Sequence, residues 1–264
     1  MRICYEVKKT MRVIAVVNLK GGVAKTTTVI NTAAFLAAEY NKKVLIIDAD
    51  SQCNCTEFMQ RDKAHTYTLA DLLRQGYDRN KAHIELSSFE NVHLLPADEE
   101  LMDLDLSKIE LGSASATCIR DMLRGPEGIG WAYDYVLIDC PPAFNAASAA
   151  ALVAADEVLI PMKLDAFSLR GMANIVRQVF NMKKINPKLG IAGILPVMWY
   201  KAENILKAEE ALKKSEFHVF SHIRRTNKVD DMTFAQEPLL ISSPKSAAAQ
   251  DYFRFVSELE RRGK

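Results

Sequence analysis

Two lysines, a glycine pair and a threonine lie close together near the amino end of the chain. They form the pattern K-G-G-x-x-K-T from Lys20 to Thr26. The apolar run 13–17 precedes them and a helical pattern follows. In a strand–loop–helix context, loop amides and the positive helix end converge on an anion. The pattern therefore predicts a polyphosphate site, with Lys25 on the β- and γ-phosphates and the Thr26 hydroxyl on Mg²⁺.

The loop departs from the common pattern G-x-x-x-x-G-K-[ST], because Asn18 and Ala24 occupy its glycine positions. A strand-to-helix turn that holds these residues by chance is the alternative interpretation. The Ala24 methyl group could crowd a phosphate if the backbone approaches closely. The predicted nucleotide contacts are Lys20, Gly21, Gly22, Val23, Ala24, Lys25, Thr26 and Thr27.

Three aspartates follow buried-looking strands. Asp139 ends the apolar run 135–139, where an unpaired carboxylate is costly and a Mg²⁺ shell would remove the cost. A salt-bridged structural aspartate is the alternative. Asp48 and Asp50 are two residues apart, so an extended chain places them on one face, where they could share a water or metal site. We predict Thr26, Asp50 and Asp139 as the metal site.

The elements that must position these residues alternate along the whole chain. Apolar, β-branched runs predict strands at 13–17, 43–48, 92–95, 135–139, 157–161, 191–197 and 219–223. Helical patterns cover 27–40, 69–75, 114–124, 146–155, 168–184, 202–214 and 247–262. This alternation predicts an α/β fold of three layers, α/β/α, with a mostly parallel twisted sheet. We expect one domain over 11–264, preceded by an overhang, 1–10.

Composition narrows the class of protein. The 264 residues are 49% hydrophobic and 25% charged, as in ordinary globular proteins. Five cysteines without a CxxC pair favour reduced thiols, and no apolar run approaches the ~18 residues of a transmembrane helix. Net charge is about −6 over residues 1–162 and about +7 over 163–264. The basic part suggests an anionic partner, with a solvated surface as the alternative.

The segment from Lys20 to Thr26 resembles the deviant Walker A phosphate loop of the ParA/MinD ATPases, whose hallmark is a lysine ahead of the glycine pair. Segments 45–52, 92–97 and 133–142 resemble that family's second strand with its first switch, its third strand, and its Walker B strand with the second switch. The likeness is greatest to short ParA/Soj partition proteins. Ser51 replaces the usual proline of the first switch, which would loosen that loop.

The resemblance implies a P-loop ATPase with ATP and Mg²⁺ as cofactors. Asp50 would position the attacking water, unless it caps a helix. Lys20 would reach the nucleotide of a second subunit, as an arginine finger does, unless it is a plain surface lysine. The implied catalytic residues are Lys20, Lys25 and Asp50. Hydrolysis would be slow and would be stimulated by a ParB-like partner protein.

The resemblance also implies a role. An ATP-bound homodimer would bind DNA non-specifically in the cytoplasm, on the nucleoid, and would partition a plasmid, a chromosome or a mobile element. Lys201 and the segment 225–228 resemble the family's basic DNA-contacting positions. The DNA-binding candidates are Lys201, Arg224, Arg225 and Lys228.

Three other interpretations remain open. Residues 227–230 fit N-K-x-D, a guanine-reading motif, so GTP is an alternative nucleotide. Cys118 and Cys140 are the pair that an iron–sulfur reductase relative would need. A MinD-like positioning ATPase would bind a membrane through its last helix. The apolar stripe there is modest and both charge signs flank it, so we expect packing onto the domain and no membrane partner.

Overall fold

A computed structural model of the chain describes residues 11–60, 65–81, 84–104 and 114–263. Within these ranges, seven strands form one sheet in the order β3-β4-β2-β5-β1-β6-β7. The strands are β1 (Arg12–Val16), β2 (Val44–Asp48), β3 (Glu85–Leu86), β4 (Val92–Leu95), β5 (Tyr135–Asp139), β6 (Glu157–Lys163) and β7 (Gly190–Val197). The expected overhang, 1–10, lies outside the described residues.

The sheet is parallel except at one edge. β1 pairs with β5 and β6, and β2 pairs with β4 and β5, all in parallel, while the two-residue β3 is antiparallel to β4. The register aligns Val16 and Asp48 with Asp139. The carboxyl ends of β1, β2 and β5 therefore meet at one edge of the sheet, where the phosphate loop and the aspartates follow.

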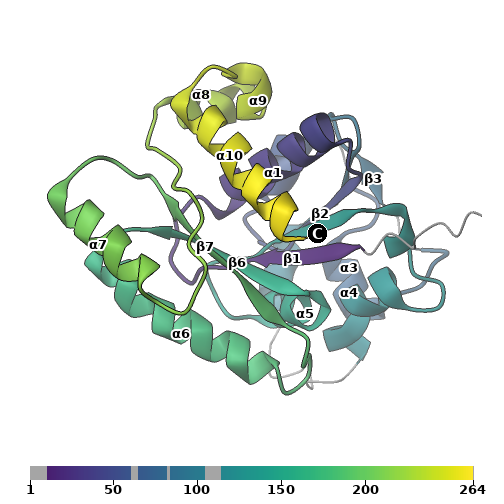
Figure 1. Ribbon diagram of the computed structural model, residues 1–264. Helices are drawn as coiled ribbons and strands as arrows, with labels where there is room; N and C mark the ends of the chain where they lie inside the picture. The colour runs from purple at the N-terminus through teal and green to yellow at the C-terminus, as the bar shows by residue number, and fades with distance from the viewer. Residues whose placement is uncertain (1–10, 61–64, 82–83, 105–113, 264) are drawn as a thin grey trace, which may run out of the picture.

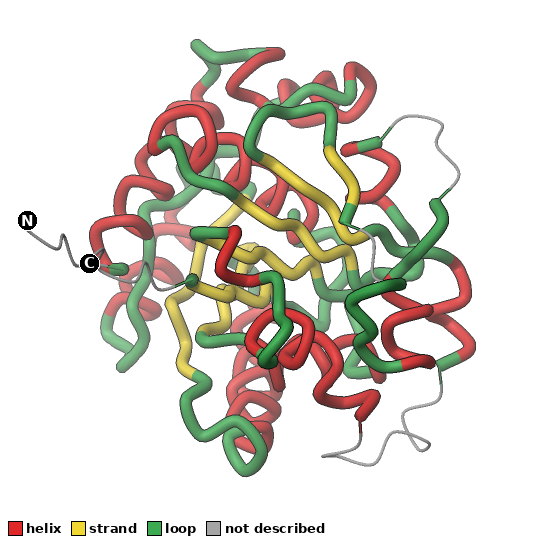
Figure 2. The backbone as a smooth tube through the Cα atoms, turned by 90° about the vertical axis from the view of Figure 1, so that its right-hand side faces the viewer, coloured by secondary structure: helices red, strands yellow, loops and turns green. Residues whose placement is uncertain are grey.

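Helices cover both faces of the sheet (Figures 1 and 2). The longer ones are α1 (Lys25–Tyr40), α3 (Leu69–Gln75), α4 (Ala114–Arg124), α5 (Ala146–Ala154), α6 (Ala166–Met182), α7 (Glu203–Lys213), α8 (Lys228–Ala235) and α10 (Ala247–Arg262). Shorter ones are α2 (Asn54–Met59) and α9 (Leu239–Ser242), with 3₁₀ turns at Glu99–Asp103 and Gly130–Ala132.

Alternate residues of the strands pack into two hydrophobic cores, one on each face of the sheet. Ile14 and Val16 of β1 pack with α1 and α10 on one face. Val13 and Ala15 pack with α3 to α7 on the other. Because both faces are covered, the central strands are apolar throughout rather than alternating. The three-layer α/β/α fold predicted from the sequence is confirmed.

The expected strand 219–223 is the main difference. This segment runs beside β7 but forms only isolated bridges, Ile194 with Val219 and Trp199 with Arg224. Pro196 lies between the bridges and has no amide to donate, so the ladder is interrupted there. The short elements β3, α2, α8 and α9 also went unpredicted, since runs of this length carry little periodic signal.

The last helix packs onto the protein as expected. Tyr252, Val256 and Leu259 of α10 are at most 1% exposed, buried against α1 and the sheet. Among the described residues, no helix is both long and apolar enough to cross a membrane.

Candidate functional site

The loop between β1 and α1 has the geometry of an anion site. Gly22 and Ala24 both adopt positive φ, 68° and 57°. The first turn of α1 has neither a side-chain cap nor an acidic residue. Its amide groups therefore lack the partners that helix starts normally find in the chain. Uncapped amides at a positive helix end attract phosphate groups.

Lys25 lies in this loop and not at the surface. Its side chain is 7% exposed, and Nζ lies 3.4 Å from the carbonyl oxygen of Lys20. Burial lowers the pKa of Lys25, while the carboxylates of Asp139 and Asp50 act to raise it. The ammonium group is thus placed where a phosphate would find an incompletely compensated cation, as the sequence predicts.

Asp139, at the end of β5, is a buried carboxyl group without a partner. It is 1% exposed, and neither oxygen accepts a hydrogen bond from any described residue. Burial, followed by repulsion from Asp48, raises its pKa well above the usual range, while the nearby Thr26 hydroxyl and Lys25 oppose the shift. Such a group needs a proton or a cation.

Asp48 and Asp50 are engaged in the loop after β2. Asp48 accepts hydrogen bonds from the Thr56 amide at 2.8 Å, the Thr56 hydroxyl at 2.7 Å and the Asp50 amide at 3.1 Å. Burial raises the pKa of Asp48 to about 6. Asp50 accepts from the Gln52 amide at 3.0 Å and is 9% exposed. The N-cap of α2 is Cys53, so Asp50 does not cap that helix.

These side chains fit one mode of magnesium binding, in which the protein supplies few of the ligands. In the described part of the chain, no group of three or more His, Cys, Asp or Glu side chains is placed to hold a metal by itself. Mg²⁺ usually binds one or two protein oxygens and completes its shell with water and substrate phosphates. Asp139, beside the Thr26 hydroxyl, fits that mode, with Asp50 close enough to interact electrostatically.

Lys20 points away from its own loop. Its Nζ lies 2.8 Å from Asp165 Oδ2 and 3.3 Å from the Ser168 hydroxyl, at the start of α6. Burial acts to raise the pKa of Asp165, but hydrogen bonds from Lys20 and Ser168 outweigh it and lower that pKa to about 2. The sequence analysis missed Asp165. Its position at a strand end, three residues before a serine, is the available signal.

Asn18 was noted in the sequence only as a departure from the common loop. Its amide donates to the Pro161 carbonyl at 2.8 Å, and its Oδ1 accepts from the Lys20 amide at 2.9 Å. A glycine could make neither contact. Asn18 thus ties the phosphate loop to the end of β6.

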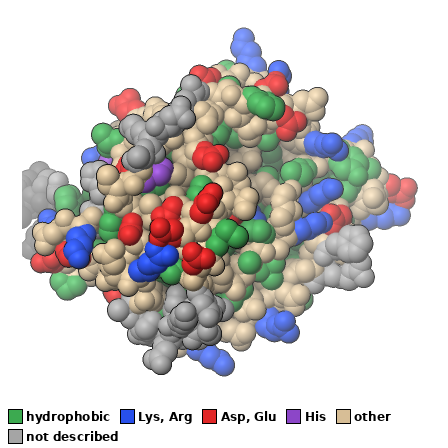
Figure 3. All heavy atoms as spheres, turned by 180° about the vertical axis from the view of Figure 1, so that it is seen from behind, with side chains coloured by type: hydrophobic (Ala, Val, Ile, Leu, Met, Phe, Trp, Pro, Cys, Tyr) green, Lys and Arg blue, Asp and Glu red, His purple; other side chains and the backbone are tan. Residues whose placement is uncertain are grey.

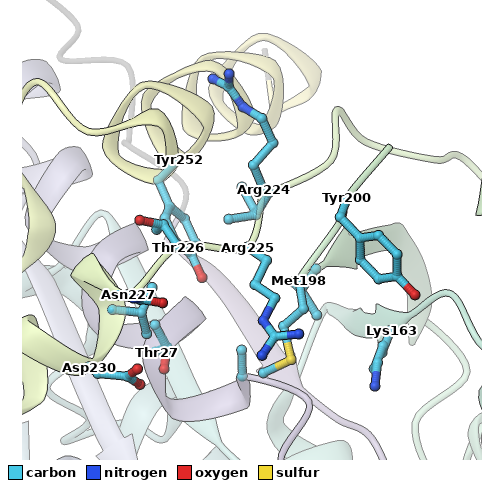
Figure 4. Close-up of a pocket in the computed structure, with 14 residues that line it drawn as sticks. Thr27, Lys163, Met198, Tyr200, Arg224, Arg225, Thr226, Asn227, Asp230 and Tyr252 are labelled. Atoms are coloured by element: carbon cyan, nitrogen blue, oxygen red, sulfur yellow. The ribbon is translucent and has the colours of Figure 1, made fainter. Parts of the chain in front are cut away.

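A cavity of about 350 Å³ adjoins the loop. Ala24 and Thr27 border it on one side. Other side chains that line the cavity point into it (Figure 4), among them Met198, Arg225 and Asp230. Asn227 and Val229 line it too, so three residues of the N-K-x-D sequence lie at this cavity.

The basic candidates do not form one group. Arg224 points away from the cavity (Figure 4) and is ion-paired with the buried Asp251 at 2.8 Å. Lys228 is paired with Asp231 at 2.7 Å, and Lys201 is exposed. On the face seen from behind, acidic side chains gather near the middle and most Lys and Arg side chains lie toward the periphery (Figure 3).

Comparison with known proteins identifies the family. Residues 11–191 match the model of an AAA domain. The chain is 32% identical over 259 residues to the chromosome partitioning protein ParA of Caulobacter vibrioides, covering 94% of each chain. It is 31% identical to the sporulation initiation inhibitor protein Soj of Bacillus subtilis, covering 96% of this chain and 99% of Soj.

The chain belongs to the ParA/MinD family. Among solved structures, it resembles a cobyrinic acid a,c-diamide synthase from Mycobacterium smegmatis with a bound ATP analogue and magnesium. That similarity has a TM-score of 0.78 at 27% identity and covers 97% of this chain and 96% of the other. The resemblance drawn from the phosphate loop is thereby confirmed.

The cysteine pair of the reductase alternative is buried. Cys118 and Cys140 are at most 1% exposed. Burial raises the pKa of the Cys118 thiol to about 12, and burial, with the Asp139 charge next, raises that of Cys140. Burial therefore disfavours the thiolate form of both residues in the ligand-free protein.

Proposed function

We propose that this chain is an ATP- and Mg²⁺-dependent switch that hydrolyses ATP slowly. The observation that carries the proposal is the buried carboxylate of Asp139, which accepts no hydrogen bond from the described residues. It lies near the uncapped start of α1 and near Lys25, whose charge the neighbouring carboxylates only partly offset. A metal–triphosphate would satisfy all three at once. A solved relative supports ATP and Mg²⁺ as the ligands, since the structure of the Mycobacterium smegmatis protein holds an ATP analogue and magnesium.

Thr26, Asp139 and Asp50 are the residues that would hold the ion and its waters. The ion would supply charge neutralisation for the phosphates. Lys25 would bind the phosphate oxygens, and Asp50 would orient a water molecule. Isothermal titration with Mg²⁺-ATP tests the proposal. We expect micromolar binding that EDTA removes, and equal heats with and without Mg²⁺ would contradict it.

ATP is the proposed nucleotide, and GTP is the alternative that one observation favours. Asn227 and Asp230 both line the cavity beside the loop. However, Arg224 to Thr226 ahead of them do not form a buried strand. Competition between ATP and GTP in the same titration separates the two, and tighter binding of GTP would reverse the assignment.

Lys20 is proposed to act across a homodimer. In the structure it is bound to Asp165 of its own chain, so the cross-subunit contact requires that ion pair to open. Size-exclusion chromatography with ATP and with ADP tests this. We expect a dimer with ATP alone, lost in Lys20→Ala and kept in Lys207→Ala, which removes an exposed lysine of α7. An ATP dimer that survives Lys20→Ala would refute the role.

Non-specific DNA binding by the ATP dimer is proposed for Lys201 and Lys228, because Arg224 is paired with Asp251 and Arg225 points into the cavity. Chromosome partitioning is the role that the name of a ParA relative gives. We extend this role to a plasmid or mobile element as the alternative cargo, to the nucleoid as the surface and to a ParB-like stimulating partner. DNA binding should require ATP and weaken steeply with salt. Equal binding with ADP would contradict it. Sedimentation with lipid vesicles tests the MinD-like alternative.

A further inference from the structure

A stacked pair of rings lies just outside the cavity. Trp199 and His222 have ring centroids 3.9 Å apart and planes within 3° of parallel. Glu209 of α7 accepts from Trp199 Nε1 at 2.9 Å and lies 3.2 Å from His222 Nδ1. Lys213 Nζ approaches the same carboxylate at 2.8 Å. Glu209 is 6% exposed, so this is a buried, fully paired charge holding two rings.

The two rings belong to the two segments that form one wall of the cavity. Trp199 is flanked by Met198 and Tyr200, which both line the cavity. His222 is followed by three lining residues, 223–225. The main chains are joined here as well, since the Trp199 amide donates to Ile223 at 2.9 Å and the Arg225 amide donates to Trp199 at 2.8 Å.

The backbone of this wall is irregular beside the ring stack. Met198 adopts φ 53°, a left-handed conformation that a non-glycine residue keeps only where its surroundings enforce it. Pro196 interrupts the ladder just before it. The ring stack and its carboxylate lie immediately beyond this weak point. They add a side-chain constraint to the backbone hydrogen bonds that join the two segments there.

The charge balance explains why the stack is stable. Burial acts to raise the pKa of Glu209, but hydrogen bonds from Lys213 and His222 outweigh it, so the pKa is lowered. The carboxylate therefore stays ionised and accepts from both rings. The rings themselves are partly exposed and contribute less to the core than a buried pair would.

We propose that Trp199, His222 and Glu209 are positioning residues for the base end of the nucleotide cavity. They would fix Met198 and Arg225 at the wall, and so set affinity for the base and ribose without contacting the phosphates. The inference rests on the proposed binding of ATP. It concerns residues that lie outside the phosphate loop, both switches and the metal site.

Two ligands separate this role from a general loss of structure. Mg²⁺-ATP uses the whole site, whereas Mg²⁺-tripolyphosphate can use only the phosphate end. We expect Trp199→Ala and Glu209→Ala to weaken ATP about tenfold while leaving tripolyphosphate unchanged, because only the wall is loosened. Trp199→Phe keeps a stacking ring but loses the Nε1 donor, so its ATP affinity should lie between wild type and Trp199→Ala.

Glu203→Ala is the matched control. Glu203 lies on the same helix and makes an exposed pair with Lys207 at 2.6 Å, so its removal should leave both affinities unchanged. Equal ATP affinity in the wild type and in all three test variants would overturn the proposal. So would a parallel loss of ATP and tripolyphosphate. If the wild type binds neither ligand, the proposed ATP function itself fails.

Tryptophan fluorescence tests the intact stack. The chain has two tryptophans, and Trp131 is 85% exposed in a turn that precedes β5, at the sheet edge opposite the loop. In a Trp131→Phe background, the emission of Trp199 should change on adding Mg²⁺-ATP and stay constant with Mg²⁺-tripolyphosphate. Constant emission with saturating ATP would refute the coupling between the stack and the base end of the cavity.

Discussion

Two buried aspartates, Asp251 and Asp139, differ in one respect. Asp251 of α10 is 0% exposed and accepts from the Arg224 amide at 3.0 Å, from its guanidinium at 2.8 and 2.9 Å, and lies 3.5 Å from Arg254. Asp139 is equally buried and accepts nothing from any described residue.

The contrast shows that burial of a carboxylate does not by itself mark a binding site. A buried charge with its hydrogen bonds made within the chain is structural, because removing its partner leaves an uncompensated charge. A buried charge whose hydrogen bonds are left open is stable only with a ligand or a proton. Asp251 is of the first kind, and Asp139 is of the second. The predictions below test this division.

The largest effect is expected for Asp251→Ala. Loss of the carboxylate frees the Arg224 amide and guanidinium, and the free energy of unfolding should fall by about 3 kcal/mol. The estimate takes the low end of the range because Arg224 is 39% exposed and can regain water. Urea unfolding measures it. A change below about 1 kcal/mol would place Asp251 with ordinary surface pairs.

Asp139→Asn should raise the free energy of unfolding, whereas Asp251→Ala lowers it. Removing the unpartnered charge should stabilise the ligand-free protein by about 1–2 kcal/mol. The thermal midpoint should then rise by about 2–4 °C per kcal/mol. The same variant should lose the extra stabilisation that Mg²⁺-ATP gives the wild type. Thermal unfolding with and without Mg²⁺-ATP checks both, and a destabilised variant would show that Asp139 has a structural partner.

Ala24→Gly should stabilise the phosphate loop by up to about 1 kcal/mol, because alanine pays a steric cost in the left-handed region that glycine avoids. Asn41→Gly is the control at the other end of α1, where φ is 49°. Asparagine tolerates this conformation, so that change should be near zero. Chemical unfolding measures the free energy of unfolding of both variants and of the wild type. A larger gain at Asn41 would contradict the argument.

The last prediction concerns the dependence of stability on pH. The pKa of Asp48 is about 6 in the folded protein and about 3.9 in an unfolded chain. As pH rises from about 4 to 6, the unfolded chain ionises first, so this residue makes folding progressively less favourable, and the effect is constant above 6. Stability of Asp48→Asn relative to wild type should therefore rise across that window. A difference independent of pH would contradict the assignment.

Much of the fold could be predicted because the relevant signals are local. The helices 114–124 and 247–262 have the predicted bounds, and each central strand is a continuous apolar run. The strand expected at 219–223 fails for a non-local reason. The neighbouring strand β7 contains Pro196, which has no backbone amide to donate. The sequence of 219–223 gives no sign of this missing hydrogen-bond donor.

The site divides in the same way. Lys25, Thr26 and Asp139 could be grouped from sequence, because the ends of parallel strands meet at one edge of the sheet. The pairing of Lys20 with Asp165 joins residues 145 positions apart. The pairing of Arg224 with Asp251 joins a bridge segment to a helix 27 positions on. Both depend on side-chain directions that periodicity does not encode.

Asp165 uses its two oxygens for separate tasks. Oδ1 accepts from the Ser168 amide at 2.8 Å and so caps α6, while Oδ2 holds Lys20. When Lys20 leaves, the cap can stay intact, and no helix turn has to unwind. The proposed contact of Lys20 with a second subunit would therefore need only side-chain rotation, on the timescale of rotamer changes and not of refolding.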